Sequence, residues 1–312
     1  MHQAYMALLP LAHKGFFMHY RLNRRQAMLS VGAAAGMAAT TRTAQAATRS
    51  SRKHAALAAR LPIRDPAFNV HTLGRLEGDL SGKVVYLHRQ GRVFGLRPGH
   101  GPELDNYGRL LYKAEGVSVR TSRLREDGAV VDKSRNWLFY RDPVTGEFLS
   151  EFANPYTDET VPVPTFRAGI TGGVSTTNGP ELAADFPMES TAFNRPMLLD
   201  WNFMGDHVWI YRHAFTRWRE GSTGSYRTEM TLDCWVCRLD DVANPKLTHI
   251  PSTYSWTSQT EWQSWLRMKD EPGAMLWRLD GVLVRSIAEL PQDFVEQCEK
   301  VLPGHLSAPF ES

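Results

Sequence analysis

Short runs of apolar and aromatic residues, separated by clusters of turn-forming residues, are the main pattern along the chain. The clearest example joins Trp137–Tyr140 and Phe148–Phe152 through residues 142–146, and a second turn cluster, 154–158, follows before Val161. Proline sets φ near roughly −65° early in such a turn, and glycine supplies the positive φ that closes it. The stretch is therefore predicted to form an antiparallel hairpin with a second turn attached.

Similar runs on both sides of this hairpin predict further strands. They are Lys83–Leu87 and Val93–Leu96 around Gly91, Leu110–Lys113 and Val117–Leu124 around Gly116, Val130–Val131, Pro196–Phe203, His207–Phe215, Tyr226–Leu239, and Ala274–Leu279 and Val282–Ile287 around Gly281. These short connections leave no room for crossover helices, which favours an antiparallel meander. We expect a mainly β fold, a lipocalin-like barrel or strongly curved sheet, because closure protects exposed strand edges.

Two helices are expected near the C-terminus. Ser258–Glu261 has the pattern of a capping box, and Pro291 can begin a final helix. Helical spacing places the apolar residues of each on one face, namely Trp262, Trp265 and Leu266 in the first helix and Phe294, Val295, Cys298 and Val301 in the second.

The segment Pro164–Asn194 is rich in Gly, Thr, Ser, Pro and Asn and has no sustained period. It is predicted to be a long loop, which is uncommon inside a compact domain and often functional. A lid over a cavity and a disordered insertion both fit this composition.

The first 46 residues are predicted to be a twin-arginine export signal. Asn23–Leu29 contains the arginine pair, Ala27–Ala39 is a weakly apolar run, and Ala44–Ala46 offers a cleavage site. The run is shorter than the roughly 20 residues of a membrane helix, so no stable membrane anchor is expected. Met18 lies nearer the arginine pair than Met1 and is the expected start codon. We therefore expect transient binding to the twin-arginine translocase and a periplasmic or secreted location; a disordered basic arm is the alternative.

Removing this signal changes the charge of the chain. Five of the 36 basic residues lie in it, which leaves 31 against 33 acidic residues. Because no cluster of Lys and Arg along the remaining sequence suggests a phosphate-backbone footprint, no nucleic-acid partner is expected. Residues 47–60 are predicted to be a polar linker, helical over His54–Arg60, and 61–312 a single β-barrel-like domain.

Common catalytic signatures are absent from the sequence. We find no GxSxG, GxGxxG, phosphate-binding GxxxxGK[ST], HExxH or calcium-loop motif. Cys234 and Cys237 form a CxxC pattern, but strand alternation sends them to opposite faces, which indicates structural thiols. His207 and His213 share a strand face but lie too far apart to chelate one ion. No cofactor and no metal site is therefore expected.

Tryptophan is concentrated in one region of the chain. Eight of the nine tryptophans lie between residues 201 and 277. Core packing is one interpretation of these residues, and a cavity that holds an apolar ligand is the other, since small barrels can enclose one ligand. The candidate substrate-binding residues are Trp137, Trp201, Trp209, Trp235 and Trp256.

Five residues are candidate catalytic groups. Glu229 and Asp233 share a strand face with Trp235. If either carboxyl faces inward, desolvation raises its pKa and suits it to general acid or base catalysis; if it faces water, it is a solvated strand charge. Arg120 or Tyr211 would stabilise developing negative charge. His213 is a candidate base, although a core histidine is the plainer interpretation.

Several segments together resemble the bacterial and fungal family called domain of unknown function 1838. The similar segments are 136–163, 227–236, 254–281 and 286–291, and the resemblance extends over about 61–302. It implies a curved antiparallel sheet of lipocalin-like character, and it implies no catalytic roles. Asp158 stands where the family tends to have Gly, and the Pro usual before Trp265 is missing.

Two functional hypotheses follow. The first is an exported, cofactor-independent enzyme of isomerase or lyase type that acts on an apolar aromatic or terpenoid molecule in a tryptophan-rich cavity. The second is a carrier of the same kind of ligand without chemistry, and a structural envelope protein is a third possibility. Acidic residues inside the sheet favour the enzyme, and a wholly apolar interior favours the carrier.

Overall fold

The computed structural model describes residues 52–97, 108–182, 188–192, 196–220 and 225–310. The predicted export signal, residues 98–107 and most of residues 183–195 lie outside the described residues. Residues 52–58 are helical, close to the helix predicted over His54–Arg60. No helix in the described part of the chain is long and apolar enough to cross a membrane.

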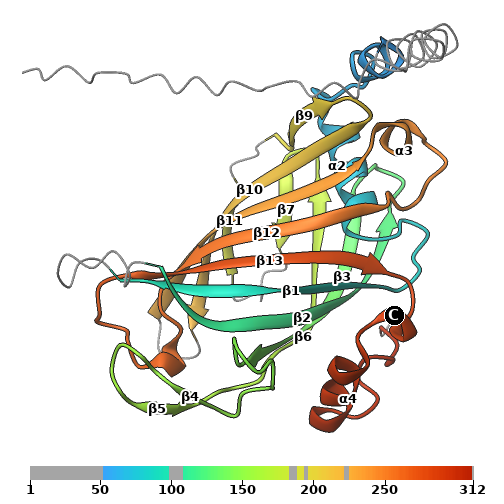
Figure 1. The fold of residues 1–312 in the computed structure, drawn as a ribbon. Helices are drawn as coiled ribbons and strands as arrows, with labels where there is room; N and C mark the ends of the chain where they lie inside the picture. The colour runs from blue at the N-terminus through green and yellow to red at the C-terminus, as the bar shows by residue number, and fades with distance from the viewer. Residues whose placement is uncertain (1–51, 98–107, 183–187, 193–195, 221–224, 311–312) are drawn as a thin grey trace, which may run out of the picture. The chain divides into compact units, whose positions relative to one another are not determined.

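The fold is mainly β (Figure 1). The helices are α2 (Pro66–Glu77), α3 (Leu239–Ala243) and α4 (Gln292–Val301), with 3₁₀ turns η3 (Ser264–Leu266) and η4 (Ile287–Glu289). The strands are β1 (Val85–Leu96), β2 (Arg109–Leu124), β3 (Val130–Arg141), β4 (Glu151–Ala153), β5 (Thr160–Pro162), β6 (Phe166–Thr176), β7 (Gly179–Leu182), β8 (Met188–Ala192), β9 (Asp200–Met204), β10 (His207–Glu220), β11 (Ser225–Arg238), β12 (Ser252–Thr260) and β13 (Ala274–Val284).

Eleven strands form one antiparallel sheet. Its order is β7-β6-β3-β2-β1-β13-β12-β11-β10-β8, with β9 also paired to β10. Sequence neighbours pair as in a meander, and the first and last long strands, β1 and β13, pair along their whole length. Between β7 and β8, the two ends of this order, no pairing is present among the described residues, so the sheet is not shown as a closed barrel.

The sheet curls strongly. Val130 of β3 and Ile210 of β10 belong to one buried cluster, although five strands separate β3 from β10 in the sheet. Membership of one cluster requires the inner faces of these distant strands to turn toward a common interior. In Figure 1, β3, β6 and β7 accordingly lie behind β10–β13.

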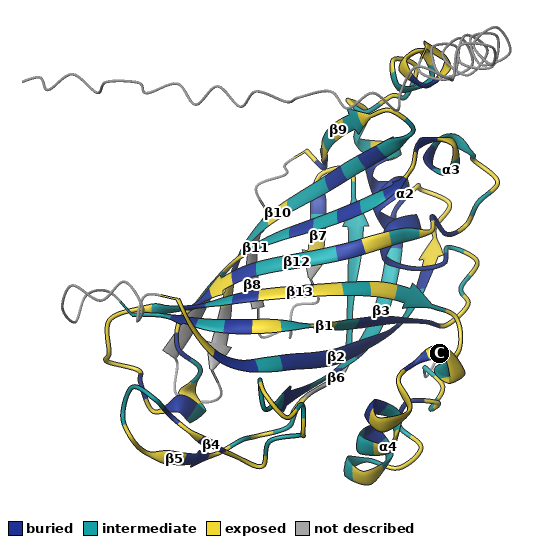
Figure 2. Cartoon of the chain, in the orientation of Figure 1, coloured by how far each residue is buried: buried dark blue, intermediate teal, exposed yellow. Residues whose placement is uncertain are grey.

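Each end of the curled sheet is filled by a different apolar cluster. At one end α2 inserts Val70, Leu73 and Leu76 against β1, β3, β10 and β11. At the other end the β4–β5 hairpin and η3 cover an aromatic cluster that contains Tyr112 and Trp277. Figure 2 shows buried residues at both ends. The middle of the interior lies between these two clusters.

The outer face of β1–β3 is covered by α4. Phe294 and Cys298 of this helix are fully buried against Val117 and Phe139. His88 lies on this outer face, with its ring 5.4 Å from that of Phe294. The helix predicted from Pro291 is therefore confirmed, including its buried face.

The central hairpin and its second turn are also confirmed. Leu149 donates a backbone hydrogen bond of 2.9 Å to Tyr140, and β4 pairs with β5 around the second turn. Asp158 in that turn has φ of 58°, a left-handed conformation that glycine adopts most readily. This explains the glycine expected there from the family resemblance.

Other predicted elements need correction. The turns predicted at Gly91, Gly116 and Gly281 are wrong, because all three glycines lie inside continuous strands. Glycine is needed at these positions because a neighbouring backbone approaches too closely for a side chain. The long loop predicted over Pro164–Asn194 is wrong, since β6 and β7 form a hairpin there. The predicted helix at Ser258–Glu261 is wrong as well, because Ser258 pairs within β12.

Candidate functional site inside the curled sheet

A polar wall forms the middle of the interior on β2 and β3. Alternation places Ser118, Arg120 and Ser122 of β2 on the inner face, opposite Asn136, Ser134 and Asp132 of β3. Ser122 donates a short hydrogen bond to Asp132, and Ser118 donates one to Asn136. Arg89 of β1 extends this wall by donating to Ser118 over 3.1 Å.

Helix α2 brings an acidic residue to this wall. Glu77, its last residue, lies 2.8 Å from Arg212 and 3.5 Å from Arg120, so one carboxylate joins β10 to β2. The helix begins at an Asp65 cap that accepts a hydrogen bond from the Ala67 N–H, followed by proline in the first turn. Its apolar stripe anchors it in the sheet and thereby fixes the position of Glu77.

Arg212 and Asp233 join the opposite wall. The Nε of Arg212 donates to Asp233 over 2.9 Å, and its NH2 group lies 2.8 Å from the same carboxylate. The hydroxyl of Tyr254 on β12 donates to the other oxygen of Asp233 over 2.5 Å. Asp233 is 3% exposed. This carboxylate is therefore held by three hydrogen-bond donors.

The surroundings shift the pKa values of two interior carboxyls in opposite directions. Burial would raise the pKa of Glu77, but Arg212 and Arg120 outweigh it and lower that pKa. Burial raises the pKa of Asp132, and the charge of Arg120 only partly offsets this effect. Burial and the nearby Asp233 carboxylate raise the pKa of Tyr254 well above its usual value. Asp132 is therefore the interior carboxyl whose protonated form is favoured by its surroundings.

The arginines in this interior are surrounded by protein but retain accessible surface. Arg120 and Arg212 keep 20% and 27% of their side-chain surface exposed. Among the described residues no acceptor pairs with the buried Nε–H of Arg120 or Arg89. Polar surface and unused donors at the centre of a curled sheet are suited to hold a polar group of a ligand.

An aromatic wall lies opposite the polar one. The rings of Trp235 and Tyr254 lie tilted against each other, with centroids 5.5 Å apart, and the Arg212 guanidinium lies 5.5 Å from the Trp235 ring centre. Trp256 faces inward beside Asp233 in the β11–β12 register, is partly exposed, and packs against both apolar clusters. The interior therefore combines an apolar surface with a charged one.

Three of the predicted catalytic residues lie on this inner face. Arg120 and Asp233 belong to the network, and Glu229 accepts a hydrogen bond of 2.8 Å from Ser258 farther along β11 and β12. The side chains do not form one compact site, because Glu229 lies four residues from Asp233 on an extended strand, about 13 Å away.

Tyr211 and His213 require a correction. They alternate with Arg212, whose side chain points inward, so both lie on the outer face of β10. His213 is largely exposed, and its Nε2 lies 3.2 Å from Asp200. Neither residue can contact the same interior molecule as Arg120.

The five predicted tryptophans are also divided between the inner and the outer face of the sheet. Trp201, Trp235 and Trp256 are on the inner side, where Trp201 donates to Asn69 of α2 over 2.9 Å. Trp209 lies on the outer face of β10. Trp137 lies on the outer face of β3, where it is buried with its ring 4.9 Å from that of His305. Trp137 and Trp209 are therefore not part of the interior wall.

The sequence reasoning missed Glu77, Asp132, Arg212 and Tyr254. The sequence contains a signal for Arg212, since Val208, Ile210 and Arg212 alternate along the strand with the predicted site residues Trp209 and Tyr211. The concave face of a tightly curled sheet has less room than the convex face. This favours the face with Val208 and Ile210 over the face with the larger Trp209 and Tyr211. In the described part of the chain, no group of three His, Cys, Asp or Glu side chains is placed to hold a metal ion.

Comparison with known proteins gives a family. Residues 82–312 match the family described as "Protein of unknown function (DUF1838)". No curated protein and no solved structure matches the chain.

Proposed function

The chain belongs to the DUF1838 family, and we propose that it binds a small apolar molecule inside its curled sheet and acts on it as a cofactor-independent isomerase or lyase. The observation that carries this proposal is the buried layer of Glu77, Arg120, Arg212 and Asp233 between two apolar clusters. An interior needed only for stability would be better filled with apolar side chains, since buried ion pairs contribute little net stability.

In this proposal each wall has its own role. The aromatic wall, Trp235 and Trp256, binds the apolar body of an aromatic or terpenoid ligand. Asp132 transfers a proton, because burial raises its pKa and makes its protonated form easier to reach. Arg120, next to Asp132 across the β2–β3 pair, stabilises negative charge that develops on the ligand. A proton removed from one carbon and returned to another needs no oxidant or reductant.

Glu229 and Asp233 have different roles in this proposal. Asp233 is a positioning residue, because Arg212 and Tyr254 hold both of its oxygens. Glu229 is the second candidate for proton transfer, since it lies on the inner face and is partly exposed. The proposal also includes a lipocalin-like barrel shape and export through the twin-arginine route, for which the arginine pair and the cleavage pattern are the support.

Ligand binding can be tested with an aromatic sulfonate dye, anilinonaphthalene sulfonate, which combines an apolar body with an anionic group. We expect saturable fluorescence enhancement and energy transfer from tryptophan in the full chain. Arg120→Gln should weaken binding about tenfold by removing a charged donor. Lys246→Gln removes one positive charge from an exposed position outside the interior, is the control, and should leave the affinity unchanged. Equal effects of both variants would contradict an interior site.

A carrier without chemistry is the second candidate. The observation in its favour is that Glu77, Arg212, Asp233 and Tyr254 satisfy one another and leave few groups free for catalysis. Asp132→Asn distinguishes the candidates once a ligand is identified. The enzyme loses turnover by about 100-fold or more, whereas a carrier binds the ligand as before. Asp270→Asn, on an exposed turn, is the matched control.

A further inference from the structure

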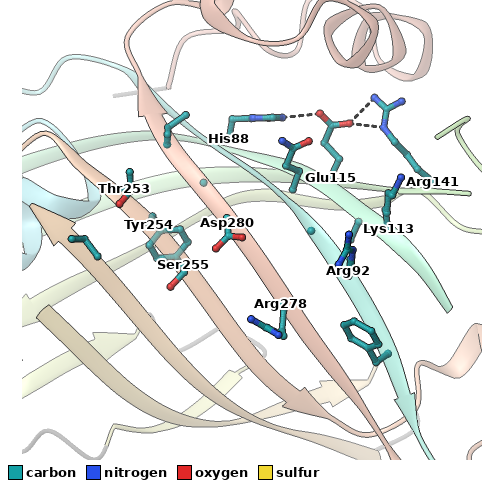
Figure 3. Close-up of a pocket in the computed structure, with 17 residues that line it drawn as sticks. His88, Arg92, Lys113, Glu115, Arg141, Thr253, Tyr254, Ser255, Arg278 and Asp280 are labelled. Atoms are coloured by element: carbon teal, nitrogen blue, oxygen red, sulfur yellow. Dashed lines mark hydrogen bonds and ion pairs between the residues drawn. The ribbon is translucent and has the colours of Figure 1, made fainter. Parts of the chain in front are cut away.

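A second polar site lies on the outer face of the sheet, away from the interior. A groove of about 990 Å³ runs over β1, β2, β12 and β13. Its lining includes His88, Arg92 and Phe94 of β1, which alternate with the inward-facing Leu87 and Val93. Figure 3 shows its charged residues. The groove therefore lies mainly on the opposite face of the sheet from the interior network, although Tyr254 of that network also contributes to its lining.

Four basic residues lie abreast in this groove. In the strand register Arg141 is opposite Lys113, Lys113 is opposite Arg92, and Arg92 is opposite Arg278. Neighbouring strands are roughly 4.8 Å apart, so the row spans about 14 Å across four strands. The basic residues are distant in sequence, and only the strand pairing brings them together.

One end of the row is neutralised by acidic partners. Arg141 donates to Glu115 over 2.6 Å and to Asp293 of α4 over 2.8 Å. Glu115 also lies 2.8 Å from the His88 ring, as the dashed lines in Figure 3 show. These contacts use the buried Glu115 carboxylate fully and leave it unable to balance the remaining cations.

The other three cations have no such partner. Within the described residues, Lys113, Arg92 and Arg278 make no side-chain hydrogen bond or ion pair. Asp280 is the remaining carboxylate in the groove lining, two residues from Arg278 on the same face. Like charges directly opposite each other in a sheet are destabilising. Lys113 has a longer-range electrostatic interaction with Asp142. Three adjacent cations without a hydrogen-bonded or ion-paired acidic partner in the described part of the chain therefore suggest an anionic ligand.

We propose that this groove binds a small soluble molecule through a phosphate or diphosphate group held by Lys113, Arg92 and Arg278. A phosphate group carries up to two negative charges and three acceptor oxygens, and guanidinium groups bind it in a bidentate manner. A single carboxylate has one charge and balances three cations less well. The rest of the molecule lies along the groove toward Thr253 and the exposed Val282.

Isothermal titration calorimetry of the full chain with sodium diphosphate at low salt tests the proposal. Saturable binding is expected, and the double variant Arg92→Gln/Arg278→Gln should weaken it by at least about tenfold. Lys246→Gln/Lys269→Gln removes the same charge from two exposed lysines elsewhere and should leave the affinity within about twofold. Arg92→Lys/Arg278→Lys keeps the charges and should recover part of the binding, which separates lost charge from lost folding.

Further arms of the experiment decide the ligand chemistry. Succinate at the same ionic strength should bind at least about tenfold more weakly than diphosphate. Vesicles of phosphatidylglycerol should not replace the soluble ligand. The proposal is overturned if diphosphate gives no saturable binding, if both glutamine double variants weaken binding equally, if succinate binds as tightly, or if only the vesicles bind. Failure of the interior site leaves these expectations unchanged, because Arg120 and Asp132, the residues varied to test it, are not part of the groove lining.

Discussion

Asp132 and Glu77 show how two carboxyls in one interior acquire opposite properties. Glu77 lies between two arginines, which keep it ionised, whereas Asp132 is buried with a single hydroxyl donor and a more distant cation. Pairs of carboxyls with separated pKa values are a common arrangement in acid–base catalysis. The two side chains also affect stability with opposite dependence on pH.

The variant Asp132→Asn tests this difference. A raised folded-state pKa stabilises the fold fully below the unfolded pKa of about 3.9, and this contribution is lost as pH rises through the folded value. The free energy of unfolding of the wild type, minus that of Asp132→Asn, should therefore fall as pH rises from below about 4 toward neutrality. Urea unfolding at several pH values measures this difference. A difference that is flat, or that rises with pH, contradicts the assignment.

Removing one partner of the buried Arg212–Asp233 pair should be costly. Asp233→Asn leaves a buried guanidinium without its main partner, and the expected loss is about 3 kcal/mol in the free energy of unfolding. Tyr254→Phe removes one hydrogen bond to the carboxylate and should cost less, about 1.5 kcal/mol.

The exposed pair Asp200–His213 provides the control for these changes. Asp200→Asn should change the free energy of unfolding by less than about 0.5 kcal/mol. Urea unfolding of the three variants gives the comparison. A loss for Asp233→Asn no greater than that for Asp200→Asn would show that the interior network does not stabilise the fold.

Glycines inside strands determine how closely the elements approach. A Cβ at Gly91 would overlap the backbone carbonyl of Arg278, and one at Gly281 would lie 2.5 Å from that of His88. These glycines belong to the β1–β13 pair that joins the first and last long strands. From sequence alone they resemble turns, because the partner strand that requires them is distant in the chain.

Gly91→Ala should therefore destabilise the fold strongly. Overpacking of this kind typically costs about 1–3 kcal/mol, and relief requires β1 and β13 to separate. Gly108→Ala is the matched control, since no atom lies within 4 Å of its added Cβ. Thermal unfolding of both variants makes the test. Equal melting temperatures would contradict the close approach of the two strands.

The row of basic residues on β1 and its neighbouring strands is expected to destabilise the fold. Arg92 has basic residues opposite it on both neighbouring strands, so Arg92→Gln should raise the melting temperature in the absence of phosphate. Lys246→Gln should leave it unchanged. Added diphosphate should stabilise the wild type more than Arg92→Gln. A lower melting temperature for Arg92→Gln without ligand would indicate that another group compensates these charges.

Local patterns predicted some elements well and others poorly. The central hairpin, the long strand β11 and α4 were found because their patterns are continuous and their turns or caps are local. β6 and β7 were missed because their Gly- and Thr-rich sequence gains its hydrogen bonds from β3. Helix α2 was missed although Asp65 and Pro66 form a recognisable start.

At the scale of the whole molecule, curling brings the functional residues together. Arg120, Glu77 and Arg212 come from β2, α2 and β10, so their proximity depends on the complete sheet. The sequence placed Asp233 and Trp235 on one face of β11, but it could not decide whether that face, or which face of β10, is inside. Alternation gives the spacing of side chains, and only the packing of α2 decides which face is inside.

The central claim is that this interior holds a small molecule. Native mass spectrometry of the protein, purified from its own cells without denaturation, tests the claim most directly. We predict a bound species of small-molecule mass on the wild type, lost on collisional activation and absent from the Arg120→Gln variant, but retained by Lys246→Gln. A wild-type protein that carries no such species, or one retained equally by Arg120→Gln, would contradict the claim.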